Sequence, residues 1–194
     1  MSLGGIRMDA VLEVSRHRFS RAQFERMVEA DVFGALDRLE LLDGEIIDMA
    51  PQKSRHATAV TLVGDALRAA LSDQGVTVRV QLPLVLDDHS EPEPDVAIVL
   101  GAPRDYRDAH PSGALLVCEV SDSTLAYDRG RKLAAYARAG IPEYWVLDLN
   151  AERLEVFRRP EQGGYAVGST LGADDCVSPL MCPNSSIRVG ELLP

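Results

Sequence analysis

The stretch ALLVCEVSDSTLAYDRGRKLAAYARAGIPEYWVLDL (114–149) contains two apolar runs on either side of an amphipathic segment. The first run, ALLVCEV (114–120), is nearly continuous in apolar residues, which is typical of a strand covered on both faces. The middle segment follows Asp128, a favourable helix N-cap, and ends at Gly140, which predicts a helix. The second run, EYWVLDL (143–149), predicts another strand. This order of strand, helix and strand predicts one central sheet.

The flanking segments extend this pattern. Helical spacing predicts helices over 20–30 and 54–72, and Asp43-Gly44 predicts a hairpin turn within 39–50. Further strands are predicted over 76–86, 95–100 and 154–159, with weak strand signals around 165–167 and 186–189. We therefore expect a mixed α/β (α+β) fold.

Composition limits the possible functions. Hydrophobic residues make up 46% of the 194 residues and charged residues 26%, as in ordinary globular proteins. The net charge is −10, so the chain lacks the global basic bias of most nucleic-acid-binding proteins. A nucleic-acid role would depend on a local patch, and an acidic charge can also reflect carboxylates that bind a cation. The candidates for a patch are Lys53, Arg55 and His56, and then Arg129, Arg131 and Lys132.

Apolar runs and cysteines indicate the compartment. The longest apolar runs, such as ALLVC (114–118), are far too short to cross a bilayer. Cys118, Cys176 and Cys182 are irregularly spaced and fit neither a disulfide framework nor paired zinc ligands. We expect a cytoplasmic protein with no membrane partner.

Two carboxylates are in unusual positions. Glu119 shares a strand face with Leu115 and Val117, where an ionised group costs several kcal/mol unless it is paired. A solvated glutamate at the strand end is the alternative. Asp95 opens the strand over 95–100, and it would lie near Glu119 if the two strands pair antiparallel. Two carboxylates that close favour a cation between them, and oxygen ligands suit Mg²⁺ or Mn²⁺.

Lys132 lies on the helix that follows the Glu119 strand, and Tyr136 is four residues further along the same face. The helix dipole disfavours a lysine near a helix start, which points to another use. A solvated lysine is nevertheless the commoner outcome at such a position, and for Tyr136 we favour packing over a hydrogen bond within the site.

The segments quoted so far resemble a known family. Pro94-Asp95, Glu119-Val120-Ser121 and DRGRKLAAYARAGIPEYWVLD (128–148) are similar to the Uma-type restriction endonucleases of the PD-(D/E)XK nuclease superfamily. LELLDGEI (39–46), Arg55-His56 and IRVGELL (187–193) also match, so the resemblance covers the chain from about Phe19 onward.

The resemblance implies an αβββαβ core with a metal-binding edge. Asp95 and Glu119 would hold Mg²⁺ (or Mn²⁺), helped by the carbonyl of Val120. The superfamily usually has a lysine where Ser121 stands, and in the Uma-type pattern Lys132 would replace it. The upstream acid of the pattern would be Glu40, with Glu45 as the less favoured alternative.

Three further residues are candidates for substrate contact or support of the site: His56, Ser121 and Tyr136. For His56 we favour a structural hydrogen bond at the helix start, and contact with phosphate is the alternative. Tyr144 and Trp145 are expected in the core, and Cys118 is expected to be a small buried residue that points away from Glu119.

The sequence thus predicts a Mg²⁺-dependent endonuclease that acts on DNA. The alternatives are a nuclease-fold interaction protein without turnover and a phosphodiesterase that acts on RNA or nucleotides. We expect residues 1–18 to form an N-terminal extension, part of which could derive from cloning, and residues 19–194 to form one nuclease-like domain. Family analogy also implies a homodimer.

Overall fold

A computed structural model describes residues 15–34, 37–49 and 51–194. Most of the predicted N-terminal extension (1–14) and the last residue of the predicted strand pair (residue 50) lie outside the described residues.

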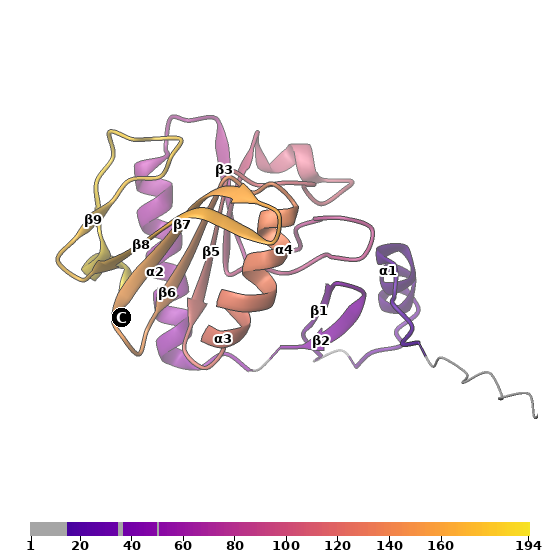
Figure 1. The fold of residues 1–194 in the computed structure, drawn as a ribbon. Coiled ribbons are helices and arrows are strands. Elements are labelled where there is room, and N and C mark those ends of the chain that lie inside the picture. The colour runs from indigo at the N-terminus through magenta and orange to yellow at the C-terminus, as the bar shows by residue number, and fades with distance from the viewer. Residues whose placement is uncertain (1–14, 35–36, 50) are drawn as a thin grey trace, which may run out of the picture.

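A six-stranded mixed sheet forms the centre of the protein (Figure 1). Its strands lie in the order β3-β4-β5-β6-β7-β8, and all neighbours are antiparallel except β5 and β6. That parallel pair requires a crossover, which the helical segment between the two strands provides. The strands are β3 (Val76–Val80), β4 (Val96–Leu100), β5 (Leu116–Ser121), β6 (Glu143–Asp148), β7 (Arg153–Glu161) and β8 (Gly164–Gly172).

Helices cover the two faces of this sheet (Figure 1). One face packs on α2 (Ser54–Ala70) and on the C-terminal segment, and Trp145 lies in this part of the core. The other face packs on the crossover helix, where Tyr136 and Tyr144 are fully buried. Together, α2, β3, β4, β5, the crossover helix and β6 confirm the predicted αβββαβ core.

The N-terminal elements form a small unit beside the sheet. Helix α1 (Arg21–Glu29) begins after a capping box between Ser20 and Gln23 and agrees with the helix predicted over 20–30. Strands β1 (Leu39–Leu42) and β2 (Glu45–Asp48) form the predicted hairpin. Backbone hydrogen bonds between Leu41 and Glu91 join the hairpin to the segment before β4.

Two predicted boundaries are wrong. The strand predicted over 76–86 ends at Val80, because Gln81 adopts a positive φ of 51° and turns the chain away from the sheet. The crossover helix begins at Leu125 rather than after Asp128, so Asp128 is inside the helix and is not its N-cap. This helix consists of α3 (Leu125–Tyr127), a π-helical turn (Asp128–Lys132) and α4 (Leu133–Arg138).

The C-terminal segment contains more strand than the sequence predicts. Strand β8 has nine residues, whereas the sequence signal was confined to 165–167. The weak signal around 186–189 corresponds to β10 (Ile187–Arg188), which pairs with β9 (Cys176–Val177). Two 3₁₀ helices, Pro103–Tyr106 and Val189–Leu192, complete the elements. None of the helices in the described part of the chain is long and apolar enough to span a membrane.

The Asp43-Gly44 turn gives a test of the hairpin. Gly44 has a φ of 77°, and an added Cβ would lie 2.7 Å from the Cβ of Arg18. We expect Gly44→Ala to lower the free energy of unfolding by about 1–3 kcal/mol in urea titrations. Gly113→Ala is the matched control, since an added Cβ there meets nothing within 4 Å, and it should stay within about 0.5 kcal/mol of the wild type. Equal stability of the two variants would contradict this account of the turn.

Candidate active site

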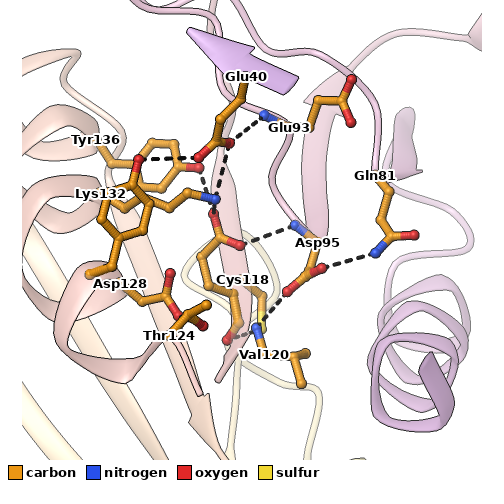
Figure 2. A network of polar contacts seen from close by, with 12 residues as sticks. Glu40, Gln81, Glu93, Asp95, Cys118, Val120, Thr124, Asp128, Lys132 and Tyr136 are labelled. Atoms are coloured by element: carbon orange, nitrogen blue, oxygen red, sulfur yellow. Dashed lines mark hydrogen bonds and ion pairs between the residues drawn. The ribbon is translucent and has the colours of Figure 1, made fainter. Parts of the chain in front are cut away.

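The pairing of β4 with β5 brings Asp95 next to Glu119. Val96 lies opposite Cys118, so Asp95, the residue before Val96, lies beside Glu119, the residue after Cys118. The backbone N–H of Asp95 donates to Oε2 of Glu119 at 3.3 Å, and the N–H of Val120 donates to Oδ2 of Asp95 at 2.9 Å (Figure 2). The predicted juxtaposition of the two acids is therefore present. Cys118 is fully buried on the opposite sheet face, as predicted.

The crossover helix supplies Lys132 and Tyr136 to the same carboxylate. Nζ of Lys132 lies 2.9 Å from Oε1 of Glu119, and the Tyr136 hydroxyl donates to the same oxygen at 2.7 Å. Both side chains are buried, so Lys132 is not a solvated lysine, and Tyr136 both packs in the core and contacts the site. Lys132 ends the π-helical turn, a local widening that is frequent at functional sites.

Glu40 reaches this group from β1, far away in the sequence. Its Oε2 lies 3.2 Å from Nζ of Lys132 and accepts a hydrogen bond from the backbone N–H of Glu93 at 3.1 Å (Figure 2). The hydroxyl of Tyr127 donates to the other oxygen at 3.2 Å. Glu45 is instead exposed and pairs with Arg131 at 2.7 Å. The upstream acid that joins the cluster is therefore Glu40.

His56 and Gln81 hold Asp95 from the other side. Nε2 of His56, in the first turn of α2, lies 3.1 Å from Oδ2 of Asp95. The Gln81 side chain donates to Oδ1 at 3.0 Å, and it can do so because the chain turns directly after β3. The favoured structural hydrogen bond of His56 is thus made to one of the two predicted acids.

Asp128 is a buried carboxylate of the site that the sequence interpretation treated only as a helix cap. Its Oδ2 accepts hydrogen bonds from the hydroxyls of Ser121 at 2.7 Å and Thr124 at 2.6 Å. The Tyr144 hydroxyl donates to its backbone carbonyl at 3.0 Å. Ser121, at the position where the superfamily usually has a lysine, therefore anchors Asp128.

The buried charges shift one another's pKa values. Burial raises the pKa of Glu119 to about 8, and the charge of Lys132 opposes this only in part. Burial acts to lower the pKa of Lys132, but Glu119 and Glu40 outweigh it and hold that pKa well above its ordinary value. Lys132 is therefore a permanent cation between two carboxylates.

Asp95 and His56 form a second pair, in which the pKa of the acid is lowered and not raised as in Glu119. The hydrogen bond to Asp95 is the main cause that raises the pKa of His56. Burial acts to raise the pKa of Asp95, but the contacts with His56 and the N–H of Val120 together lower it. Asp95 is thus kept ionised in a buried position, which suits a ligand of a cation.

A cavity of about 320 Å³ opens over these groups. Its wall carries more acid than base, since Arg38, Lys53 and Lys132 are the permanent cations among its lining residues. Such a wall repels a phosphate unless a further cation is bound. The seven carboxylates that line it are Glu40, Asp48, Glu93, Asp95, Glu119, Asp122 and Asp128.

The six basic candidates do not form one patch. Lys53 is at the cavity with an exposed side chain, 3.5 Å from Asp122. Arg55 donates to the backbone carbonyl of Leu149, and Lys132 is buried. Arg129 pairs with Glu155 and Asp148, and Arg131 with Glu45. Most of these charges are thus already compensated.

Tyr127, Gln81 and Asp128 are the site residues that the sequence interpretation missed. Tyr127 directly precedes the family-like block over 128–148, and the π-helical turn that follows it places Nζ of Lys132 5.9 Å from the centre of its ring. Gln81 fell within a segment predicted to be strand, and only its positive φ brings it to Asp95.

The pKa of Glu119 predicts how stability depends on pH in metal-free protein. An unfolded glutamate loses its proton near pH 4.5, whereas folded Glu119 keeps it to about pH 8. Between these values the unfolded state binds fewer protons, so the Glu119 contribution makes the free energy of unfolding fall as pH rises. We expect Glu119→Gln to reduce this slope in urea titrations with EDTA from pH 5 to 8. Glu45→Gln, at an exposed carboxyl, should keep the wild-type slope, and an unchanged slope in Glu119→Gln would contradict the assignment.

Comparisons with known proteins agree with this fold. A crystal structure described as a putative nuclease belonging to DUF820, from Anabaena variabilis ATCC 29413, superposes with a TM-score of 0.69. It is 14% identical, and the match covers 90% of this chain and 97% of that one, which shows a shared fold. No curated protein matches this chain. Residues 21–190 match the family Uma2, described as "Putative restriction endonuclease". The chain belongs to this Uma2 family of the restriction-endonuclease type.

Proposed function

We propose that the protein is a Mg²⁺- or Mn²⁺-dependent endonuclease that hydrolyses phosphodiester bonds in DNA. One observation carries the proposal: Asp95 and Glu119 meet from neighbouring strands beside the buried ammonium of Lys132, at a cavity. Membership of the Uma2 family supports it.

The carboxylates have capacity for a metal ion. Oδ1 of Asp95 and Oε2 of Glu119 each accept a single hydrogen bond, and a carboxylate oxygen has two lone pairs. Across the described residues, no three His, Cys, Asp or Glu side chains are grouped closely enough to hold a metal alone. Mg²⁺ commonly binds through only one or two carboxylates, with waters and substrate phosphate as its other ligands. Asp95 and Glu119, helped by the carbonyl of Val120, therefore fit Mg²⁺ or Mn²⁺.

The metal and the chain have different tasks in this proposal. A bound divalent cation supplies charge neutralisation on the phosphate and a more acidic water. The chain's own residues set the geometry around it: His56 and Gln81 hold Asp95, while Tyr136 and Lys132 hold Glu119.

In this proposal Lys132 has the catalytic role that the superfamily usually gives to a lysine two residues after its second acid. Its ammonium is charged at neutral pH, and Glu40 and Glu119 restrain it on two sides. From there it stabilises negative charge that develops on the scissile phosphate, or orients the attacking water. Ser121 is bonded to Asp128, which explains why it takes no part in this step.

We also propose that the chain acts as a cytoplasmic homodimer. The edge strand β8, GYAVGSTLG, has nine residues and no charged side chain, and such an edge is suited to strand pairing with a second copy. The three free cysteines suit a reducing compartment.

The activity is tested by incubating supercoiled plasmid with the protein and Mg²⁺ or Mn²⁺. We expect nicking that falls at least about 100-fold in Asp95→Ala and in Lys132→Ala, since each removes a charge that acts on the transition state. Glu45→Gln is the control, because this exposed acid lies outside the cluster and should leave the rate unchanged.

Cleavage that persists in both alanine variants would point to a contaminant and reject this site. No cleavage of DNA in any condition, with cleavage of RNA that depends on Asp95 and Lys132, would favour the RNA alternative. Metal binding without cleavage of either polymer would favour the interaction protein.

Metal binding is measured separately by calorimetric titration of Mn²⁺. We expect the wild type to bind Mn²⁺, and Asp95→Asn and Glu119→Ala to bind at least about tenfold more weakly, because each loses an anionic oxygen ligand. Glu45→Gln should bind as the wild type does. Equal affinity in all four proteins would place the metal elsewhere.

A further inference from the structure

A second cavity, of about 600 Å³, lies between α1 and the segment before β4. Arg38 and Glu93 line both this cavity and the one over Asp95 and Glu119, so the two are neighbours with a shared wall. Its size falls in the range of small-molecule sites. No residue of the proposed catalytic cluster lines it.

The charge of this second cavity selects its ligand. Arg38 is the one permanently charged basic residue among its lining side chains, beside His110, whose pKa is lowered mainly by burial. An anion such as a phosphate is therefore repelled, and a cation is attracted. The six carboxylates that line it are Glu25, Glu29, Asp31, Asp37, Glu91 and Glu93.

Glu91 is a buried acid that lacks a partner for one of its oxygens. The residue is only 6% exposed, and its Oε2 accepts no hydrogen bond from any residue of the described chain. Arg21 lies near enough to act on the pKa of Glu91, but its guanidinium donates to Glu25. An unpaired buried carboxylate oxygen is costly, and the residue that carries it lines the cavity.

The remaining wall is apolar and aromatic. The rings of Phe24 and Phe33 lie 6.0 Å apart at 44°, and Val28, Leu39 and Pro83 complete this side. A hydrated metal ion gains nothing from such a surface, whereas the hydrocarbon part of an organic cation is stabilised by it. Aromatic faces also attract ammonium and guanidinium groups.

We infer that this cavity is a binding site for a small organic cation, in which an ammonium or guanidinium group pairs with Glu91 and an apolar body packs on Phe24 and Phe33. The inference is independent of nuclease activity, because it uses no residue of the proposed catalytic cluster. Occupancy would change the electrostatic potential at Arg38 and Glu93, the wall shared with the catalytic cavity.

The test compares butylguanidinium with its neutral isostere butylurea, by calorimetry and by backbone amide NMR shifts. We expect butylguanidinium to bind at least tenfold more tightly and to shift the amides of Phe24, Phe33 and Gly34. Equal binding of butylurea would overturn the inference, because the charge would then contribute nothing.

Variants show whether the ligand binds in this second cavity or in the cavity over Asp95 and Glu119. Glu91→Gln should weaken butylguanidinium binding at least tenfold, while Asp65→Asn, an exposed acid on α2, should leave it unchanged. Glu91→Gln should unfold at the same or a higher temperature than the wild type, since it removes a buried unpaired charge. Binding that is weakened by Asp95→Asn but not by Glu91→Gln would assign the ligand to the catalytic cavity and overturn the proposal.

Discussion

The buried ammonium of Lys132, held between the carboxylates of Glu40 and Glu119, is the interaction on which the rest of the site depends. A buried ammonium alone would cost several kcal/mol in the interior, and its close pairing with these two acids makes its burial tolerable. The three residues come from β1, β5 and the crossover helix, so the ion cluster ties the N-terminal hairpin to the sheet. The same charges that hold these elements together are those proposed to act on the substrate.

Strand register makes this arrangement possible. Because β4 and β5 are antiparallel with Val96 opposite Cys118, Asp95 and Glu119 lie side by side and project from the same face of the sheet. A register shift of one residue would turn Glu119 toward the α2 face, which is filled by apolar side chains. The alternation of Val117, Cys118 and Glu119 along β5 thus serves the core and the site at once.

Carboxylates outnumber basic side chains in the wall of the cavity over Asp95 and Glu119 and in the wall of the second cavity. The two cavities differ in the hydrogen-bond donors that these carboxylates meet. Asp95 and Glu119 accept hydrogen bonds from neighbouring strands and helices, which leaves both acids ordered and keeps Asp95 ionised. In the second cavity Glu91 lacks a partner for one of its oxygens, and Phe24 and Phe33 contribute aromatic rings to the wall. This difference is the basis of the two proposals: a hard metal ion at the first cavity and an organic cation at the second.

Local patterns in the sequence were enough to predict a mixed α/β fold with one central sheet and the hairpin at Asp43-Gly44, because apolar periodicity and turn residues act over short distances. The αβββαβ order was implied by the family resemblance, and the meeting of Asp95 with Glu119 was predicted on condition that their strands pair antiparallel. Tertiary structure alone brought Gln81 to Asp95 and Tyr127 to Glu40, and made Asp128 a buried acceptor rather than a helix cap. These contacts depend on where the chain leaves a strand and where a helix starts. Such boundaries are decided by packing between distant segments, which no local pattern encodes.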